Sequence, residues 1–110
     1  MKKQRRLTSA RDFDRVFREG RRASTRAVLC AAANSAGAGR VAVTAAQDVR
    51  GAVRRNRAKR LLRETLLRVA PSLRPDVDIV LVAKMGIVGK TFQDVEDDVR
   101  HVLERSGAAC

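Results

Sequence analysis

The sequence predicts a single α+β domain in which helices cover a small sheet of about four strands. The chain has 110 residues, which suits one domain over 1–110 with one modest core. Hydrophobic residues make up 45% of the chain, enough for it to fold. Three segments carry apolar residues at helical spacing, and short apolar runs typical of strands lie between them. The predicted order is helix, strands, helix, strand, helix.

The first helix is expected over 9–19. Ser9 and Asp12 form a helix start signal, apolar residues then recur at helical spacing, and Gly20 ends the pattern. The residues before this helix, 1–8, are expected to form a flexible basic tail.

Two strands with a turn between them are expected next. Residues 26–33 contain an apolar run with strand character, and residues 34–39 are rich in Ser, Ala and Gly, which is typical of a turn. Residues 40–44 partly alternate polar and apolar side chains. This arrangement predicts that the second strand pairs back on the first as a hairpin.

The remaining elements are a helix, a strand and a last helix. Apolar residues over 52–70 lie on one side at helical spacing, and Pro71 closes the segment. Residues 76–82 pass from alternation to a continuous apolar run, which fits a central, buried strand. Thr91 with Asp94 then predicts the start of the last helix.

The charge of the chain points to a polyanionic partner. Lys and Arg number 24 against 12 Asp and Glu, which gives a formal net charge of +12. The basic residues concentrate in 1–26 and in 50–63, and the second of these segments holds no acid. Arginine outnumbers lysine 19 to 5, which suits bidentate contacts with phosphate.

The helix predicted over 52–70 should present this charge outward. An arc of polar side chains lies opposite its leucines: Asn56, Arg57, Lys59, Arg60 and Arg63. A solvated helix face normally interleaves both signs, yet Glu64 is the first acid in this helix. We therefore expect polyanion binding here, whereas for the basic tail a solvated segment remains equally open.

Membrane insertion and export are not indicated. No apolar run approaches the ~18 residues of a membrane span, and no apolar stretch follows the basic opening residues. A cytoplasmic protein is expected. The placement of Cys30 and Cys110 suggests neither a disulfide framework nor a zinc site.

No catalytic or metal site of the chain's own is expected. His101 is the only histidine, so no nucleophile and base pair can be assembled, and a surface position is favoured for it. The acids Asp94, Glu96, Asp97 and Asp98 follow Thr91, where they favour the helix dipole and lack the spacing of a calcium loop.

The segment 55–64 resembles a known family signature. It reads R-N-R-A-K-R-L-L-R-E, similar to the R-N-R-x-K-R-x-x-R-E signature of the bacterial ribonuclease P protein subunit. Further matches cover essentially the whole chain: Arg5-Arg6-Leu7, Asp12-Phe13, Val16-Phe17, Gly20, Ala52-Val53 and Asp78-Ile79-Val80.

The resemblance implies a small sheet flanked by helices, with a left-handed crossover into the last strand. It also implies a function: binding the catalytic ribonuclease P RNA and precursor tRNA, assisting endonucleolytic removal of the 5′ leader, and broadening the substrate range. Catalysis would then belong to the RNA subunit and its magnesium ions, with no cofactor bound by the protein. No obligate protein partner is expected.

The resemblance also assigns roles to residues. Those expected to bind the RNA subunit are Arg55, Asn56, Arg57, Lys59, Arg60 and Arg63. Phe13 and Phe17 would bind the leader, although an aromatic pair at this spacing is by itself more typical of a core. Arg50 and Arg54 would add phosphate contacts.

The segment 44–51 departs from the family pattern. Gln47 and Asp48 stand among residues where the family usually has lysines, so we expect weaker leader binding than in typical relatives. An alternative function remains open: a general structured-RNA or ribosomal-RNA-binding protein without a role in tRNA processing.

Overall fold

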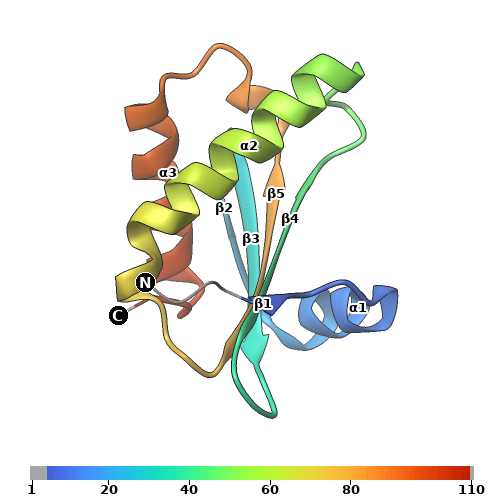
Figure 1. Cartoon of the computed structure of the whole chain (residues 1–110), viewed down its shortest axis with the longest axis vertical. Helices are drawn as coiled ribbons and strands as arrows, with labels where there is room; N and C mark the ends of the chain where they lie inside the picture. The colour runs from blue at the N-terminus through green and yellow to red at the C-terminus, as the bar shows by residue number, and fades with distance from the viewer. Residues whose placement is uncertain (1–4, 110) are drawn as a thin grey trace.

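The computed structural model describes residues 5–109 of the chain and confirms the α+β class (Figure 1). Its longer elements follow the predicted order. They are, in sequence, β1 (Arg5–Arg6), α1 (Ala10–Glu19), β2 (Arg21–Ser24), β3 (Val28–Asn34), β4 (Arg40–Ala45), α2 (Ala52–Val69), β5 (Val77–Ala83) and α3 (Phe92–Arg105). Two short 3₁₀ turns, Ala70–Ser72 and Met85–Ile87, flank β5.

The strand order is β1-β4-β5-β3-β2. β5 lies between β3 and β4, antiparallel to β3 and parallel to β4, and α2 forms the crossover from β4 to β5. The predicted hairpin of the 26–33 and 40–44 strands is therefore wrong. Six of the seven β5 residues are buried, so this strand buries the most apolar surface when it is central. It therefore lies between β3 and β4 and separates them.

Two edge strands were not predicted. β2 pairs with β3, and three of its four side chains are exposed, so it has no apolar alternation to reveal it. β1 pairs in parallel with the start of β4, and the following Leu7 is buried. The prediction of a flexible tail over 1–8 is therefore wrong for its described part. Pairing with β4 and burial of Leu7 hold this part on the sheet. Residues 1–4 of the predicted tail lie outside the described residues.

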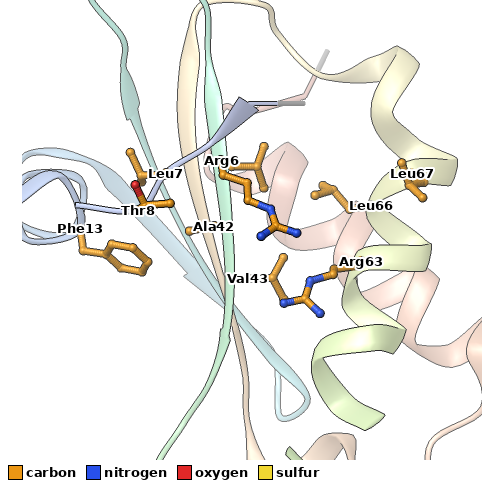
Figure 2. Close-up of a pocket in the computed structure, with 10 residues that line it drawn as sticks. Arg6, Leu7, Thr8, Phe13, Ala42, Val43, Arg63, Leu66 and Leu67 are labelled. Atoms are coloured by element: carbon orange, nitrogen blue, oxygen red, sulfur yellow. The ribbon is translucent and has the colours of Figure 1, made fainter. Parts of the chain in front are cut away.

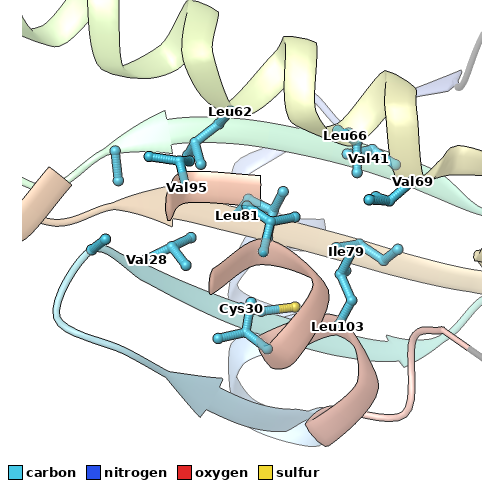
Figure 3. Packing of buried hydrophobic residues seen from close by; sticks show 14 of the residues in the cluster. Val28, Cys30, Val41, Leu62, Leu66, Val69, Ile79, Leu81, Val95 and Leu103 are labelled. Atoms are coloured by element: carbon cyan, nitrogen blue, oxygen red, sulfur yellow. The ribbon is translucent and has the colours of Figure 1, made fainter. Parts of the chain in front are cut away.

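One face of the sheet is covered by α2 and α3 (Figure 1). Leu62 of α2, Leu103 of α3, and Ile79 and Leu81 of β5 are all at most 1% exposed and pack together between these layers (Figure 3). Large aliphatic side chains from these three elements supply most of the hydrophobic driving force for folding.

Within residues 5–109, α1 is the only helix on the opposite face, where it packs against β3 and β5 (Figure 1). A smaller cluster forms there around Val16, with Ala31, Ala42 and Val80 of the sheet. At Gly20, where α1 ends, an added Cβ would lie 2.4 Å from the carbonyl oxygens of both Val16 and Ala32. Only glycine allows the helix to meet the sheet this closely.

Candidate nucleic-acid interface

The α2 helix places its basic residues in three different environments. Arg54, Asn56, Arg57 and Arg60 are exposed, and Lys59 is half-buried. No acid lies in the first turn of the helix. These five side chains, four of them cationic, are named the α2 band and form a basic surface open to a polyanion.

Arg55 is turned inward instead. Its guanidinium donates hydrogen bonds to the carbonyl oxygens of Ala46 at 2.7 Å, Val49 at 3.2 Å and Ala45 at 3.0 Å. This side chain therefore holds the loop between β4 and α2 in place. Helical spacing gave no sign of this role, because the carbonyls come from a loop whose path the sequence pattern does not reveal.

The same loop carries the departures from the family pattern. Gln47, Asp48 and Arg50 are exposed, Val49 is fully buried, and Gly51 begins α2 with φ of +88°. A left-handed backbone at this position favours glycine. The acid at position 48 thus lies on the surface beside the N-terminal end of the α2 band.

Arg63 faces a groove at the outer edge of β4. This edge groove has a volume of about 300 Å³, and its walls come from β1, α1, β4 and α2. Figure 2 shows the Arg6 and Arg63 guanidinium groups directed into the same space beside Val43, with Phe13 across the strand. Other residues lining it include Leu66 and Leu67.

Phe13 and Phe17 are both half-buried on α1, and both pack against the cluster around Val16. The Arg22 guanidinium lies 5.6 Å from the Phe17 ring centroid and donates to the Phe17 carbonyl oxygen at 2.6 Å. Both side chains are thus partly buried and partly accessible, an arrangement intermediate between core and binding platform.

A buried carboxylate that sequence reasoning missed fixes α1 to this face. Asp78 of β5 has no exposed side-chain area, and it binds the guanidinium groups of Arg15 and Arg40. Arg40 also reaches Asp12 of α1 at 3.0 Å. In sequence Asp78 only continued the polar alternation of a strand, so nothing marked it as the centre of an ion cluster.

The titration of this cluster follows from its contacts. Burial raises the pKa of Asp78, but hydrogen bonds from Arg40 and Arg15 outweigh it and leave the pKa below its usual value. The same contacts, first with Asp78 and then with Asp12, raise the pKa of Arg40. Asp78 and Arg40 are therefore both charged at neutral pH.

Two acids near the start of α3, Asp94 and Glu96, lie in different environments. Thr91 caps the helix by accepting a hydrogen bond from the Asp94 backbone at 3.1 Å, as predicted. Glu96 is buried instead, and its carboxylate lies 2.8 Å from Arg68 and 3.3 Å from Arg100. His101 is exposed. Within residues 5–109 the acids, cysteine and histidine form no group that could hold a metal ion.

Cys30 is fully buried on the α3 side of β3, with its sulfur 3.3 Å from the Ser106 hydroxyl. Burial raises the pKa of this thiol to about 11, although the contact with Ser106 lowers it slightly. Cys110 lies outside the described residues. No helix in the described part of the chain is long and apolar enough to cross a membrane.

Solved structures with this fold include two bacterial proteins. The ribonuclease P protein of Staphylococcus aureus superposes with a TM-score of 0.83 over 98% of this chain and 100% of its own, at 24% identity. The protein of Thermotoga maritima gives a TM-score of 0.81 over 93% of this chain and 97% of its own, at 23% identity. These similarities confirm the fold.

Sequence relatives place the chain in a family. A ribonuclease P protein component of an Exiguobacterium species is 34% identical over 96% of this chain and 93% of its own length. That of Brevibacillus brevis is 30% identical over 96% of this chain and 86% of its own. The ribonuclease P family model matches residues 1–107. The chain therefore belongs to the ribonuclease P protein family.

Proposed function

We propose that this chain, as the protein subunit of ribonuclease P, binds the catalytic RNA through the α2 band and the 5′ leader of precursor tRNA on the α1 face of the sheet. It acts in the cytoplasm by holding the leader near the cleavage site and broadening the range of substrates. The RNA, with bound magnesium, carries out phosphodiester hydrolysis.

The strongest support is the basic charge of the α2 band. Arg54, Arg57 and Arg60 are exposed, and among the described residues none of their guanidinium groups takes part in an ion pair. Exposed arginines without acidic partners keep their full capacity for bidentate phosphate contacts. Asn56 and Lys59 add donors on the same stretch of helix, and Arg50 continues the band beyond its start.

The leader site is supported by accessible aromatic edges beside cationic groups. Phe13 and Phe17 are half-buried rather than enclosed, and Arg22 lies over one of them. Unpaired bases stack on such rings, and base stacking contributes about 1–3 kcal/mol per base. A single-stranded leader fits this surface, because its bases are free to leave their own stack.

Cleavage of a 5′-labelled precursor tRNA at low magnesium tests the proposal. The matching ribonuclease P RNA is assayed with the protein, without it, and beside the protein alone. We expect efficient cleavage only in the combination, and an affinity for the RNA subunit that falls with salt at a log–log slope of ~0.7–0.9 per phosphate contacted.

Arg57→Ala provides the matched variant, because this exposed side chain has no described contact that folding would lose. It should weaken binding of the RNA subunit without changing the helical circular dichroism. If the protein binds structured RNA with steep salt dependence but never stimulates cleavage beside a working control subunit, the general RNA-binding function replaces this one.

A further inference from the structure

We infer that the edge groove binds one unpaired nucleotide of the 5′ leader, with its phosphate between Arg6 and Arg63 and its base against the wall of α2. This inference rests on the proposed function and extends it to a specific site. Neither Arg6 nor the leader role of Arg63 follows from the signature residues alone.

The charge of the groove selects an anion. Arg6 and Arg63 come from opposite walls, β1 and α2, and their guanidinium groups point into one space (Figure 2). None of the described residues that line the groove is an acid. Within residues 5–109, no hydrogen bond or ion pair uses either guanidinium, so both remain available to a phosphate.

The backbone of β4 offers a donor and an acceptor in the same place. The Val41 carbonyl accepts the Leu7 N–H at 2.9 Å, and the Ala45 carbonyl accepts the Arg55 guanidinium at 3.0 Å. Because alternate residues of a strand direct their peptide groups to the same side, Val43 between them presents its N–H and C=O to the groove.

The short unpaired stretch of the β4 edge at Val43 favours a nucleobase over an added peptide strand as the ligand. Between Val41, which accepts from Leu7, and Ala45, which accepts from Arg55, only Val43 directs its peptide groups to this edge. An added peptide strand needs several consecutive pairings, which this stretch cannot provide. The polar edge of a single nucleobase requires only one donor and one acceptor.

The size and polarity of the groove agree with this ligand. Leu67 is 49% exposed and lies beside the nearly buried Leu66, so α2 offers an apolar wall that a base can cover. The volume of about 300 Å³ lies at the lower end for small-ligand sites, which suits one nucleotide rather than several.

Phe13 assigns the nucleotide to the leader rather than to the RNA subunit. It lines the edge groove and belongs to the same face of α1 as Phe17. A strand lying on that face would therefore continue into the groove around the edge of β4. The bases of folded RNA are mostly paired, whereas a leader nucleotide can turn its base out.

The test measures substrate affinity of the complete complex of RNA subunit and protein. Precursor tRNAs with leaders shortened one nucleotide at a time are compared with mature tRNA, for wild-type protein and for Arg6→Ala, Arg63→Ala and Leu67→Asp. Arg105→Ala is the matched control, because it removes one exposed charge from α3, away from the groove.

We expect wild-type affinity to rise as the leader lengthens, and each groove variant to lose about ten-fold for every leader long enough to reach the groove. Binding of mature tRNA by each groove variant, and binding of the RNA subunit by Arg6→Ala and Leu67→Asp, should stay within two-fold of the Arg105→Ala control. For Arg6→Ala and Arg63→Ala, the log–log slope of precursor affinity against salt should fall by about 0.7, because one phosphate contact is lost. Arg6→Ala combined with Arg63→Ala should cost less than the two single effects together, since both hold one phosphate.

Two outcomes would overturn the inference while the proposed function stands. Groove variants that behave like Arg105→Ala at every leader length would show that no leader nucleotide occupies the groove. Variants that weaken binding of mature tRNA or of the RNA subunit as strongly as binding of the precursor would assign the groove to other RNA contacts. If the tRNA affinity of the wild-type complex does not change with leader length, leader binding itself is contradicted, and so is the proposed groove site.

Discussion

The two faces of the sheet differ in how completely they are covered. Toward α2 and α3, the buried cluster draws large aliphatic residues from both helices and from β5, including Leu62, Leu81 and Leu103. Toward α1, the described members of the buried cluster are Leu7, Val16 and three small or medium sheet residues. The difference is in the number and size of the side chains that each helix layer contributes.

This asymmetry separates stability from binding. The double-helix face buries most of the apolar area, so it should account for most of the free energy of folding. The α1 face compensates for its small cluster with the charged contacts of Asp78, and it leaves Phe13 and Phe17 half-buried. Incomplete coverage by one short helix is what keeps this face open to a ligand.

The largest expected effect comes from truncating the closed face. Leu81→Ala should lower the free energy of unfolding by about 4 kcal/mol, because it removes a fully buried side chain and leaves a cavity between α2 and α3. Val80→Ala, the next residue on the opposite face, should cost only about 2 kcal/mol. Urea denaturation measures both, and equal losses would contradict the asymmetry.

The next effect concerns the ion cluster on the α1 face. Asp78→Asn should lower the free energy of unfolding by about 3 kcal/mol, since it leaves Arg15 and Arg40 without their buried partner. It should also weaken leader binding, because α1 carries both phenylalanines. Urea denaturation and affinity for precursor against mature tRNA are the two measurements.

Glu96→Gln is the matched control for that variant. Glu96 is a buried carboxylate bound by two arginines as well, but it joins α2 and α3 on the closed face. It should reduce stability while leaving the preference for precursor tRNA unchanged. If both substitutions shift that preference equally, Asp78 does not position the leader site.

Local patterns predicted the helices well but not the sheet order. The helices expected over 9–19 and 52–70 match α1 and α2 closely, because helical periodicity and end signals are local properties. Strand pairing depends on contacts between distant segments. Nothing within 26–44 reveals that β5, which follows in the chain, enters between β3 and β4.

The site shows the same division between local and distant information. The exposure of Arg57 and Arg60 follows from helical spacing, and the structure agrees. The inward turn of Arg55 depends on where the preceding loop runs, and the opening of the groove at Arg63 depends on how short β1 is. These features need the tertiary path of the chain, which spacing does not contain.

A smaller effect on the closed face depends on pH. The pKa of Cys30 is about 11 in the folded protein and about 8.5 in an unfolded chain, so folding favours the protonated thiol. This stabilisation is complete below pH 8.5 and is lost as the pH rises toward 11. At pH 10 it should amount to about 2 kcal/mol less than at pH 7.

Thermal denaturation between pH 7 and 10 measures this loss for the wild type and Cys30→Ala. The alanine variant should be less dependent on pH over this range, because other groups titrate equally in both proteins. Identical slopes would show that the Cys30 thiol ionises as readily in the folded state as in the unfolded one.

The smallest expected effect compares two arginines of the signature that lie two residues apart. Arg55→Ala removes three hydrogen bonds to the loop before α2 and should destabilise the protein by about 1–2 kcal/mol. Arg57→Ala should change stability by less than about 0.5 kcal/mol, because its side chain is exposed. Urea denaturation and RNA-subunit affinity, measured on both variants, separate folding from binding. Arg55→Ala could instead retain full stability and lose RNA affinity as Arg57→Ala does. That result would show that the Arg55 guanidinium of the wild-type protein leaves the loop carbonyls for phosphate when RNA binds.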